Sequence, residues 1–355
     1  MDPTPSLAFD LDRLRPGADL RGADLRDVPL SSRNLRGADL AGADLRGVEM
    51  DGVLLIDSNL TGADCRGARL SGVAMERTSL AGAKLAGAVF DECFLENVEF
   101  HDLQLDAVTF NSCVMSQADF RRASLQRSVL VGSILDAARF SGCNMEGANL
   151  SQCILMGADL AGARLVGADL EQALLTDANL AGADCTDTVL SGAILENATA
   201  PGAIFRSAFL VGTYALRADL SGCDFSGAKL SVGTFTRSTL ARATFFHTTA
   251  ENAVFEYADL REAKMSQSAF SFSNFVGAAF GGAQAAACSF FGADFYWSNL
   301  DDLRQAQCDL ESARMPEPVA VAFGPGVAPP PVQPLPLYRV PSAAGQQSDN
   351  PGAVR

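Results

Sequence analysis

Histidine is scarce in this chain: its 355 residues include two, His101 and His247. The two lie far apart in the sequence, and we expect no Ser/His/Asp, Cys/His or metal-ligand cluster around either of them. Glycine-rich phosphate loops are also missing, since the glycines are spread at a regular spacing. We therefore expect no catalytic residues, no metal site and no cofactor.

Long apolar runs are missing as well. A membrane-spanning helix needs about 20 consecutive apolar residues, so we expect no membrane contact. The first residues, Met1 to Pro5, lack the basic segment of a secretory signal. A formal net charge of −15 disfavours direct nucleic-acid binding, because proteins that bind phosphate backbones present basic surfaces.

What the chain does have is an unbroken period of five. From Leu20 to Leu310 nearly every fifth residue is Leu, Phe or Met, and the residue two places earlier is usually Ala or another small one. A polar residue, often Asp or Asn, lies between them, as in Ala18-Asp19-Leu20. This period matches neither the α-helix nor the β-strand. It predicts a backbone that turns a corner every five residues, with two side chains inside and three outside.

The nine cysteines follow the same period. Their number first suggests disulfides or a metal site, but all nine fall on the two inward positions. We therefore interpret them as small apolar core residues. Reduced thiols, in a chain without a secretory signal, favour the cytoplasm. The cysteines are Cys65, Cys93, Cys113, Cys143, Cys153, Cys185, Cys223, Cys288 and Cys308.

The tandem Ala-Asp/Asn-Leu-x-x units of residues 17–315 resemble the pentapeptide-repeat family. The resemblance implies an all-β fold, a right-handed parallel β-helix of square cross-section with four pentapeptides in each coil. For a repeat region of this length it implies about 15 coils.

The two ends of the chain break the period. We expect residues 1–16 to form an N-terminal cap and residues 316–324 a C-terminal one, because a solenoid must cover its open core. Residues 325–355 are rich in proline and predict a disordered tail. Four apolar residues are expected to cover the first coil: Leu7, Phe9, Leu11 and Leu14.

With 20 residues in a coil, residues twenty apart stack on one face. The outward residues of the first face include seven acids and one base, Arg139. We take this acidic face as a candidate binding surface. The second face begins with Asp24, Asp44 and Asp64 and becomes mixed later. The acids of the first face are Asp19, Asp39, Glu99, Asp119, Asp159, Asp219 and Asp259.

The fourth face differs, because seven successive coils carry a large apolar residue at the outward position. An exposed apolar stripe of this kind typically marks an interaction site. The alternative is that such residues merely pack on one another along a sheet, which does not explain why the other faces lack the stripe. We call these residues the apolar stripe: Phe94, Val114, Ile134, Ile154, Leu174, Ile194 and Tyr214.

The family resemblance suggests a function for an acidic rod. Several pentapeptide-repeat proteins resemble B-DNA in width and surface charge and bind DNA gyrase or topoisomerase IV, and some protect these enzymes from quinolones or toxins. The first hypothesis is therefore a non-enzymatic DNA mimic that binds a type II topoisomerase. The alternative is a rigid scaffold or adaptor, for example in a bacterial secretion or assembly system. A homodimer through the apolar stripe or an end cap is a further hypothesis.

Overall fold

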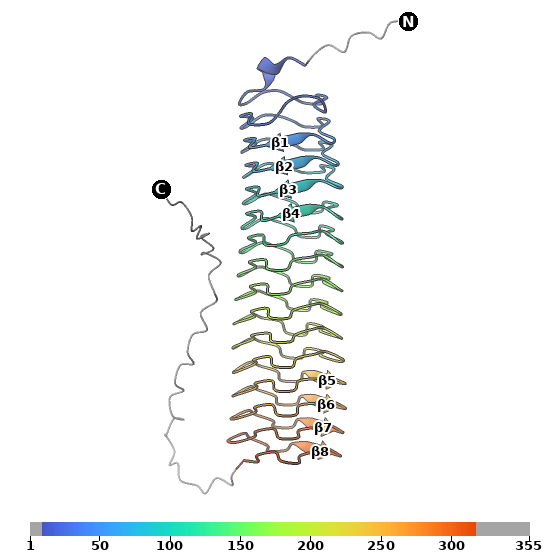
Figure 1. Ribbon diagram of the computed structural model, residues 1–355, viewed down its shortest axis with the longest axis vertical. Coiled ribbons are helices and arrows are strands. Elements are labelled where there is room, and N and C mark those ends of the chain that lie inside the picture. Colours follow the sequence, from blue (N-terminus) through green and yellow to red (C-terminus); the bar gives the residue numbers. More distant parts are fainter. Residues whose placement is uncertain (1–8, 317–355) are drawn as a thin grey trace, which may run out of the picture. The chain divides into compact units, whose positions relative to one another are not determined.

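Consecutive pentapeptides close into stacked, four-sided coils. The computed structural model describes residues 9–316, and these form a parallel β-solenoid (Figure 1). β-Bridges join outward residues twenty positions apart, as in Asp19↔Asp39 and Asn34↔Leu54. The expected all-β solenoid with four pentapeptides in each coil is confirmed.

The number of turns is slightly smaller than expected. The solenoid has about 13 turns rather than about 15. The difference lies at the two ends of the solenoid. The first and last coils each have a neighbour on one side only, and the smaller number counts the coils that pair on both sides. On the first face, for example, Asp19 pairs only with Asp39, and Asn299 pairs only with Ala279.

Two parallel sheets of four short strands stand out along the solenoid. The first lies on the third face, in the N-terminal half, and the second lies on the second face, near the C-terminal end (Figure 1). In both, each strand pairs with the one twenty residues later. The strands are β1 (Glu49–Asp51), β2 (Arg69–Ser71), β3 (Val89–Asp91), β4 (Thr109–Asn111), β5 (Thr244–Phe246), β6 (Lys264–Ser266), β7 (Gln284–Ala286) and β8 (Arg304–Ala306).

Most corners are tight turns closed by a backbone hydrogen bond, such as the 3.0 Å bond from Ala38 N–H to the Leu35 carbonyl. The third residue of the turn has a positive φ, which favours glycine. Gly37 has φ +65° there, but 33 residues other than glycine within residues 9–316, including the β-branched Val232, adopt the same conformation. The coil-to-coil pairing therefore imposes the left-handed conformation at nearly every corner, on many kinds of residue.

The core is a set of side-chain ladders that run along the solenoid. The two inward positions of almost every repeat are buried, as the period predicts. Leu fills most of the larger positions in the N-terminal half, and Phe fills many in the C-terminal half. Stacked rings of Phe235, Phe255, Phe275 and Phe295 have centroids 5.0–5.1 Å apart, close to the roughly 4.8 Å spacing of paired strands.

The described part of the N-terminal cap is a short 3₁₀ turn, η1 (Leu11–Arg13), which begins at Asp10. Leu14 is buried and Phe9 packs against the core, whereas Leu11 is 41% exposed and does not cover the first coil. Arg13 donates a 2.9 Å hydrogen bond to the Asp19 carbonyl. Leu7, the C-terminal cap from residue 317 on and the Pro-rich tail lie outside the described residues.

No helix within residues 9–316 has the length and apolar character that a membrane crossing requires.

The phenylalanine ladders predict that removal of an inward ring lowers the free energy of unfolding far more than removal of an outward ring. We expect Phe255→Ala to lower the free energy of unfolding by about 3–5 kcal/mol, because it opens a cavity between two stacked rings. Phe272→Ala is the matched control, since this ring is 57% exposed, and its effect should stay within about 0.5 kcal/mol. Denaturant unfolding followed by circular dichroism measures both, and equal shifts would contradict the ladder.

Candidate functional site

The apolar stripe of the fourth face is continuous in the structure. β-Bridges link Phe94 to Val114 and continue, coil by coil, to the bridge between Ile194 and Tyr214. Phe94 is 45% exposed and Tyr214 is 36% exposed. The five residues between them are partly exposed, because each side chain rests on its neighbours along the ladder.

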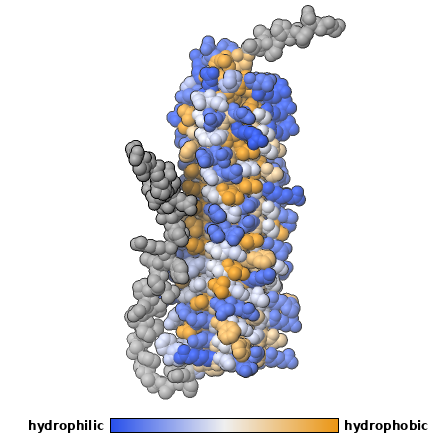
Figure 2. All heavy atoms as spheres, viewed as in Figure 1, coloured by the Kyte–Doolittle hydropathy of each residue, from blue (hydrophilic) through white to orange (hydrophobic). Residues whose placement is uncertain are grey.

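Two further apolar side chains widen the stripe at the adjacent corners. Met156 is 45% exposed and Val211 is 37% exposed. On the face of the rod drawn in Figure 2, apolar residues lie in patches among polar ones. The fourth face therefore carries an apolar surface that extends over several adjacent coils.

The backbone explains why these side chains point outward. Residues on either side of each stripe residue are buried, as Cys93 and Leu95 are beside Phe94. The Phe94 N–H donates to the Val73 carbonyl at 2.9 Å, and the Phe94 carbonyl accepts from Met75 N–H at 2.8 Å. Both backbone groups are used in coil-to-coil pairing, so only the side chain is available to a ligand.

Acidic residues flank the stripe on both sides. At the corner positions two or three residues before and after each stripe residue there are seven acids and one base, Arg217. Arg217 pairs with one of these acids, Glu196, at 2.5 Å. The other acids form no ion pair with any residue of the described solenoid. We call these six the flanking acids: Asp91, Glu92, Glu96, Asp136, Glu171 and Asp177.

Two of the flanking acids have an unused acceptor at the protein surface. Glu96 Oε2 and Asp136 Oδ1 are shielded by the surrounding atoms, yet neither accepts a hydrogen bond from any group in residues 9–316. A shielded acceptor without a partner is unfavourable. Because these two oxygens are enclosed, they are not themselves open to a bound molecule, but neither carboxylate, beside Phe94 and Ile134, has its charge compensated within residues 9–316.

The acids of the first face have a different environment, because arginines of the same chain neutralise several of them. Arg21 contacts both Asp19 and Asp39, and Arg261 pairs with Asp259 at 2.6 Å. Glu99 lies 3.7 Å from the His101 ring. Asp159 and Asp219 have no ion pair within residues 9–316, although both carboxylates accept hydrogen bonds.

Asp119 corrects the expectation that every acid of this face is displayed. It is 2% exposed, and it is covered by Arg121 at 2.6 Å and Arg139 at 3.2 Å. The first face therefore presents less free negative charge than its outward residues alone suggest, because arginines at the next corner and in the next coil lie over the carboxylates.

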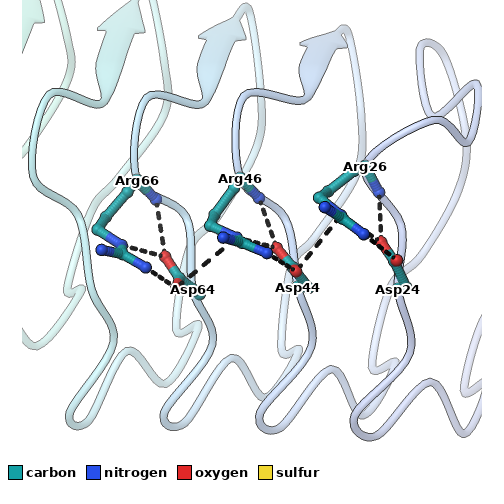
Figure 3. A network of polar contacts seen from close by, with 6 residues as sticks. All are labelled: Asp24, Arg26, Asp44, Arg46, Asp64 and Arg66. Carbon is teal, nitrogen blue, oxygen red and sulfur yellow. Dashed lines mark hydrogen bonds and ion pairs between the residues drawn. The ribbon is translucent and has the colours of Figure 1, made fainter.

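The start of the second face shows the same pairing as a continuous network (Figure 3). Each arginine donates two hydrogen bonds to the aspartate two residues before it, as Arg26 does to Asp24 at 2.8 and 2.6 Å. Arg26 also lies 3.4 Å from Asp44 in the next coil. These arginine hydrogen bonds lower the pKa of Asp24, Asp44 and Asp64. The predicted acidic start of this face is in fact a balanced ladder of both charges.

The cysteines behave as core residues. Eight are buried and Cys308 is partly buried. Burial raises the pKa of the Cys143 and Cys153 thiols to about 12, so these thiols stay protonated and unreactive. Residues 9–316 contain no group of His, Cys, Asp or Glu side chains able to hold a metal ion.

The flanking acids are the part of the candidate site that the sequence analysis missed, because it considered only the outward residue of each repeat. They stand at the corners, where the period leaves residue choice open. Stacking the corner positions in columns of twenty would have found them, because acids recur there beside the apolar stripe. The exposed aromatic residues Phe272 and Trp297 are corner residues of the same kind.

The arginine pairing predicts the titration of the first face. A hydrogen bond from Arg21 lowers the pKa of Asp19 from 3.8 to about 2. Since this folded-state pKa lies below that of the unfolded chain, the pair stabilises the fold above about pH 4 and loses that contribution as the pH falls through about 2. Arg21→Gln should return the pKa toward 3.8 in a carboxyl ¹³C NMR titration. Arg33→Gln, which removes an arginine without an ion pair in the described residues, should leave the pKa of Asp19 unchanged, and an equal shift in both variants would contradict the pairing.

Several solved structures are similar to this chain. HetL, a pentapeptide repeat protein involved in heterocyst differentiation regulation from Nostoc sp. strain PCC 7120, is 22% identical, with a TM-score of 0.31 over 63% of this chain and 90% of its own. A trypsin-treated form of QnrB1, a plasmid-mediated fluoroquinolone resistance protein, is 22% identical, with a TM-score of 0.31 over 53% of this chain and 90% of its own. A pentapeptide repeat protein from the Arabidopsis thaliana thylakoid lumen is 23% identical, with a TM-score of 0.13 over 36% and 68%.

These likenesses carry no argument about function. No curated protein matches the chain. The family model of pentapeptide repeats matches overlapping segments that together span residues 23–97, 113–215 and 217–283. These segments make up more than half of the sequence, and their period agrees with the coils of the solenoid. The chain belongs to the pentapeptide-repeat family.

Proposed function

We propose that this protein is a non-catalytic rod that binds a protein partner along the apolar stripe. Pentapeptide-repeat solenoids are generally non-catalytic. One observation carries the proposal: six of the seven acids beside the stripe have no ion pair within residues 9–316, whereas many acids on the first and second faces are paired with arginines of the chain itself. A surface of exposed apolar residues with a free polar rim is typical of an interface.

The charge of the surface favours a protein over a nucleic acid as the partner. The chain has a net charge of −15, and the edges of the stripe are more acidic than basic. A phosphate backbone would be repelled there. The role we propose is that of a scaffold or adaptor in the cytoplasm, where the nine free cysteines of the solenoid stay reduced.

A second copy of the chain is disfavoured as the partner on this face. Two stripes packed face to face would bring Glu96, Asp136 and the other flanking acids of one copy against those of the other. Such like-charge contacts cost free energy at an interface. A homodimer through the stripe is still a hypothesis, and photo-crosslinking distinguishes it from binding to a different protein.

Site-specific photo-crosslinking tests this function. We expect the photoreactive residue p-benzoylphenylalanine at Ile154 to give one discrete adduct with a different protein in the cells that naturally produce the chain. Val189 is the matched control, because it is also β-branched and partly exposed but lies on the third face, and it should give no such adduct. Equal adducts from both positions, or adducts of the chain with itself alone, would exclude the proposal.

DNA mimicry at a type II topoisomerase is a second candidate function. It is supported by the net charge of −15 and by Asp159 and Asp219 of the first face, whose carboxylates have no ion pair in the described solenoid. The arginine pairs of Asp19, Asp39, Asp119 and Asp259 reduce that support, because they neutralise the charge that would mimic phosphates.

Enzyme assays decide on the second candidate. A DNA mimic is expected to inhibit DNA supercoiling by gyrase, or to relieve quinolone poisoning of gyrase or topoisomerase IV, at micromolar concentration. Asp159→Lys combined with Asp219→Lys should abolish the effect, whereas Ile134→Asp combined with Ile154→Asp should not. A purified chain without effect on either enzyme rules out this candidate.

A further inference from the structure

We propose that the element bound on the apolar stripe is a cationic amphipathic α-helix of the partner, lying along the axis of the rod. This inference rests on the proposed function and names the chemistry of the partner. Three observations carry it: the paired backbone of the fourth face, the repeat distance of the stripe and the free carboxylates at its edges.

The paired backbone excludes a partner that adds a strand to this face. The N–H groups of Val114 and Ile134 donate to carbonyls of the preceding coil at 2.9 Å, and their carbonyls accept from N–H groups of that same coil at 2.7 Å. A strand that joins a sheet needs unpaired N–H and C=O groups. On this face only side chains remain available, so the partner must also bind through side chains, as an amphipathic helix does.

The repeat distance of the stripe suits a helix parallel to the rod. Paired strands are spaced by about 4.8 Å, and an α-helix presents one turn every 5.4 Å or so. One helical turn therefore lies over approximately one coil. The seven stripe residues span six such steps, about 29 Å, which corresponds to a helix of about 19 residues. An extended chain is a poorer match, because side chains on one side of a strand repeat at about 6.6 Å.

The edges of the stripe select the charge of that helix. Flanking acids stand on both sides: Glu92 and Glu171 at one corner, and Glu96 and Asp136 at the other. Lys or Arg residues on both flanks of the helix would reach these carboxylates while its apolar side covers Ile134 and Ile154. The carboxylates of Glu96 and Asp136, which have no ion pair within residues 9–316, would then receive charge-assisted donors.

Two helical peptides of about 19 residues test the inference. Both have the same leucine face, and they differ only in Lys/Arg or Glu residues on the flanks. Fluorescence anisotropy with the full chain measures their affinities. We expect the basic peptide to bind at least about tenfold more tightly than the acidic one, and the difference to shrink when NaCl rises from about 50 to 500 mM.

Variants of the chain locate the binding. The double variant Ile134→Asp with Ile154→Asp should lower the affinity for the basic peptide at least about tenfold, because it places charge in the apolar contact. The flank variant combines Glu96→Gln, Asp136→Asn and Glu171→Gln. It should lower the affinity for the basic peptide by about fivefold and reduce the salt dependence of that affinity. The matched control removes three acids from other faces: Asp169→Asn, Asp187→Asn and Asp219→Asn. It changes the net charge equally and should leave the affinity almost unchanged. Circular dichroism confirms that each variant keeps the fold.

The outcomes separate this inference from the proposed function. Equal binding of the acidic peptide, or equal losses in the flank and control variants, would overturn the cationic helix. If crosslinking at Ile154 nevertheless gives a discrete heterologous adduct, the rod still binds a partner there, but of another chemistry. If the basic peptide binds with the expected specificity and crosslinking shows no difference between Ile154 and Val189, the inference about chemistry stands and the proposed function is wrong.

Discussion

The backbone hydrogen bonds between coils, at a constant offset of 20 residues, are the constraint on which the whole solenoid depends. They fix which residues stack, which side chains point inward and where each corner falls. They also force residues as different as Val232 and Trp297 into a left-handed conformation at corners. One inserted residue would turn every later inward side chain outward, which explains why the period never shifts between Leu20 and Leu310.

This constraint separates the core from the surface. Inward positions can hold any apolar side chain that fills the ladder. Phe can therefore replace Leu at the larger inward positions toward the C-terminal end without a change in the geometry of the coil. Outward and corner positions face no such demand, and their residues vary from face to face. We therefore place the proposed function where outward residues depart from the usual Asp or Asn, as they do from Phe94 to Tyr214.

Much of the fold follows from the sequence, because a strict period determines both burial and stacking. The phase of Leu20 and its equivalents identifies the buried ladders, the core role of the cysteines and the apolar stripe. What the period cannot supply is the conformation of long side chains. Arg121 and Arg139 bury Asp119, and Arg26 and Arg46 neutralise the start of the second face. These contacts depend on side-chain rotamers and not on the phase of the repeat. A count of the outward acids therefore overestimates the negative charge that is left unpaired.

The difference between paired and free carboxylates also bears on specificity. Surface ion pairs such as Arg26–Asp24 contribute little stability, but they remove charge from the field of the rod. Glu96 and Asp136 keep theirs beside an apolar surface. Covering that surface with an acidic or neutral partner would bury unpaired carboxylates at a high cost, whereas a basic partner would compensate them. In the function that we propose, the flanking acids would thus reject wrong partners, including a second copy of the chain, while the apolar stripe would supply the attraction.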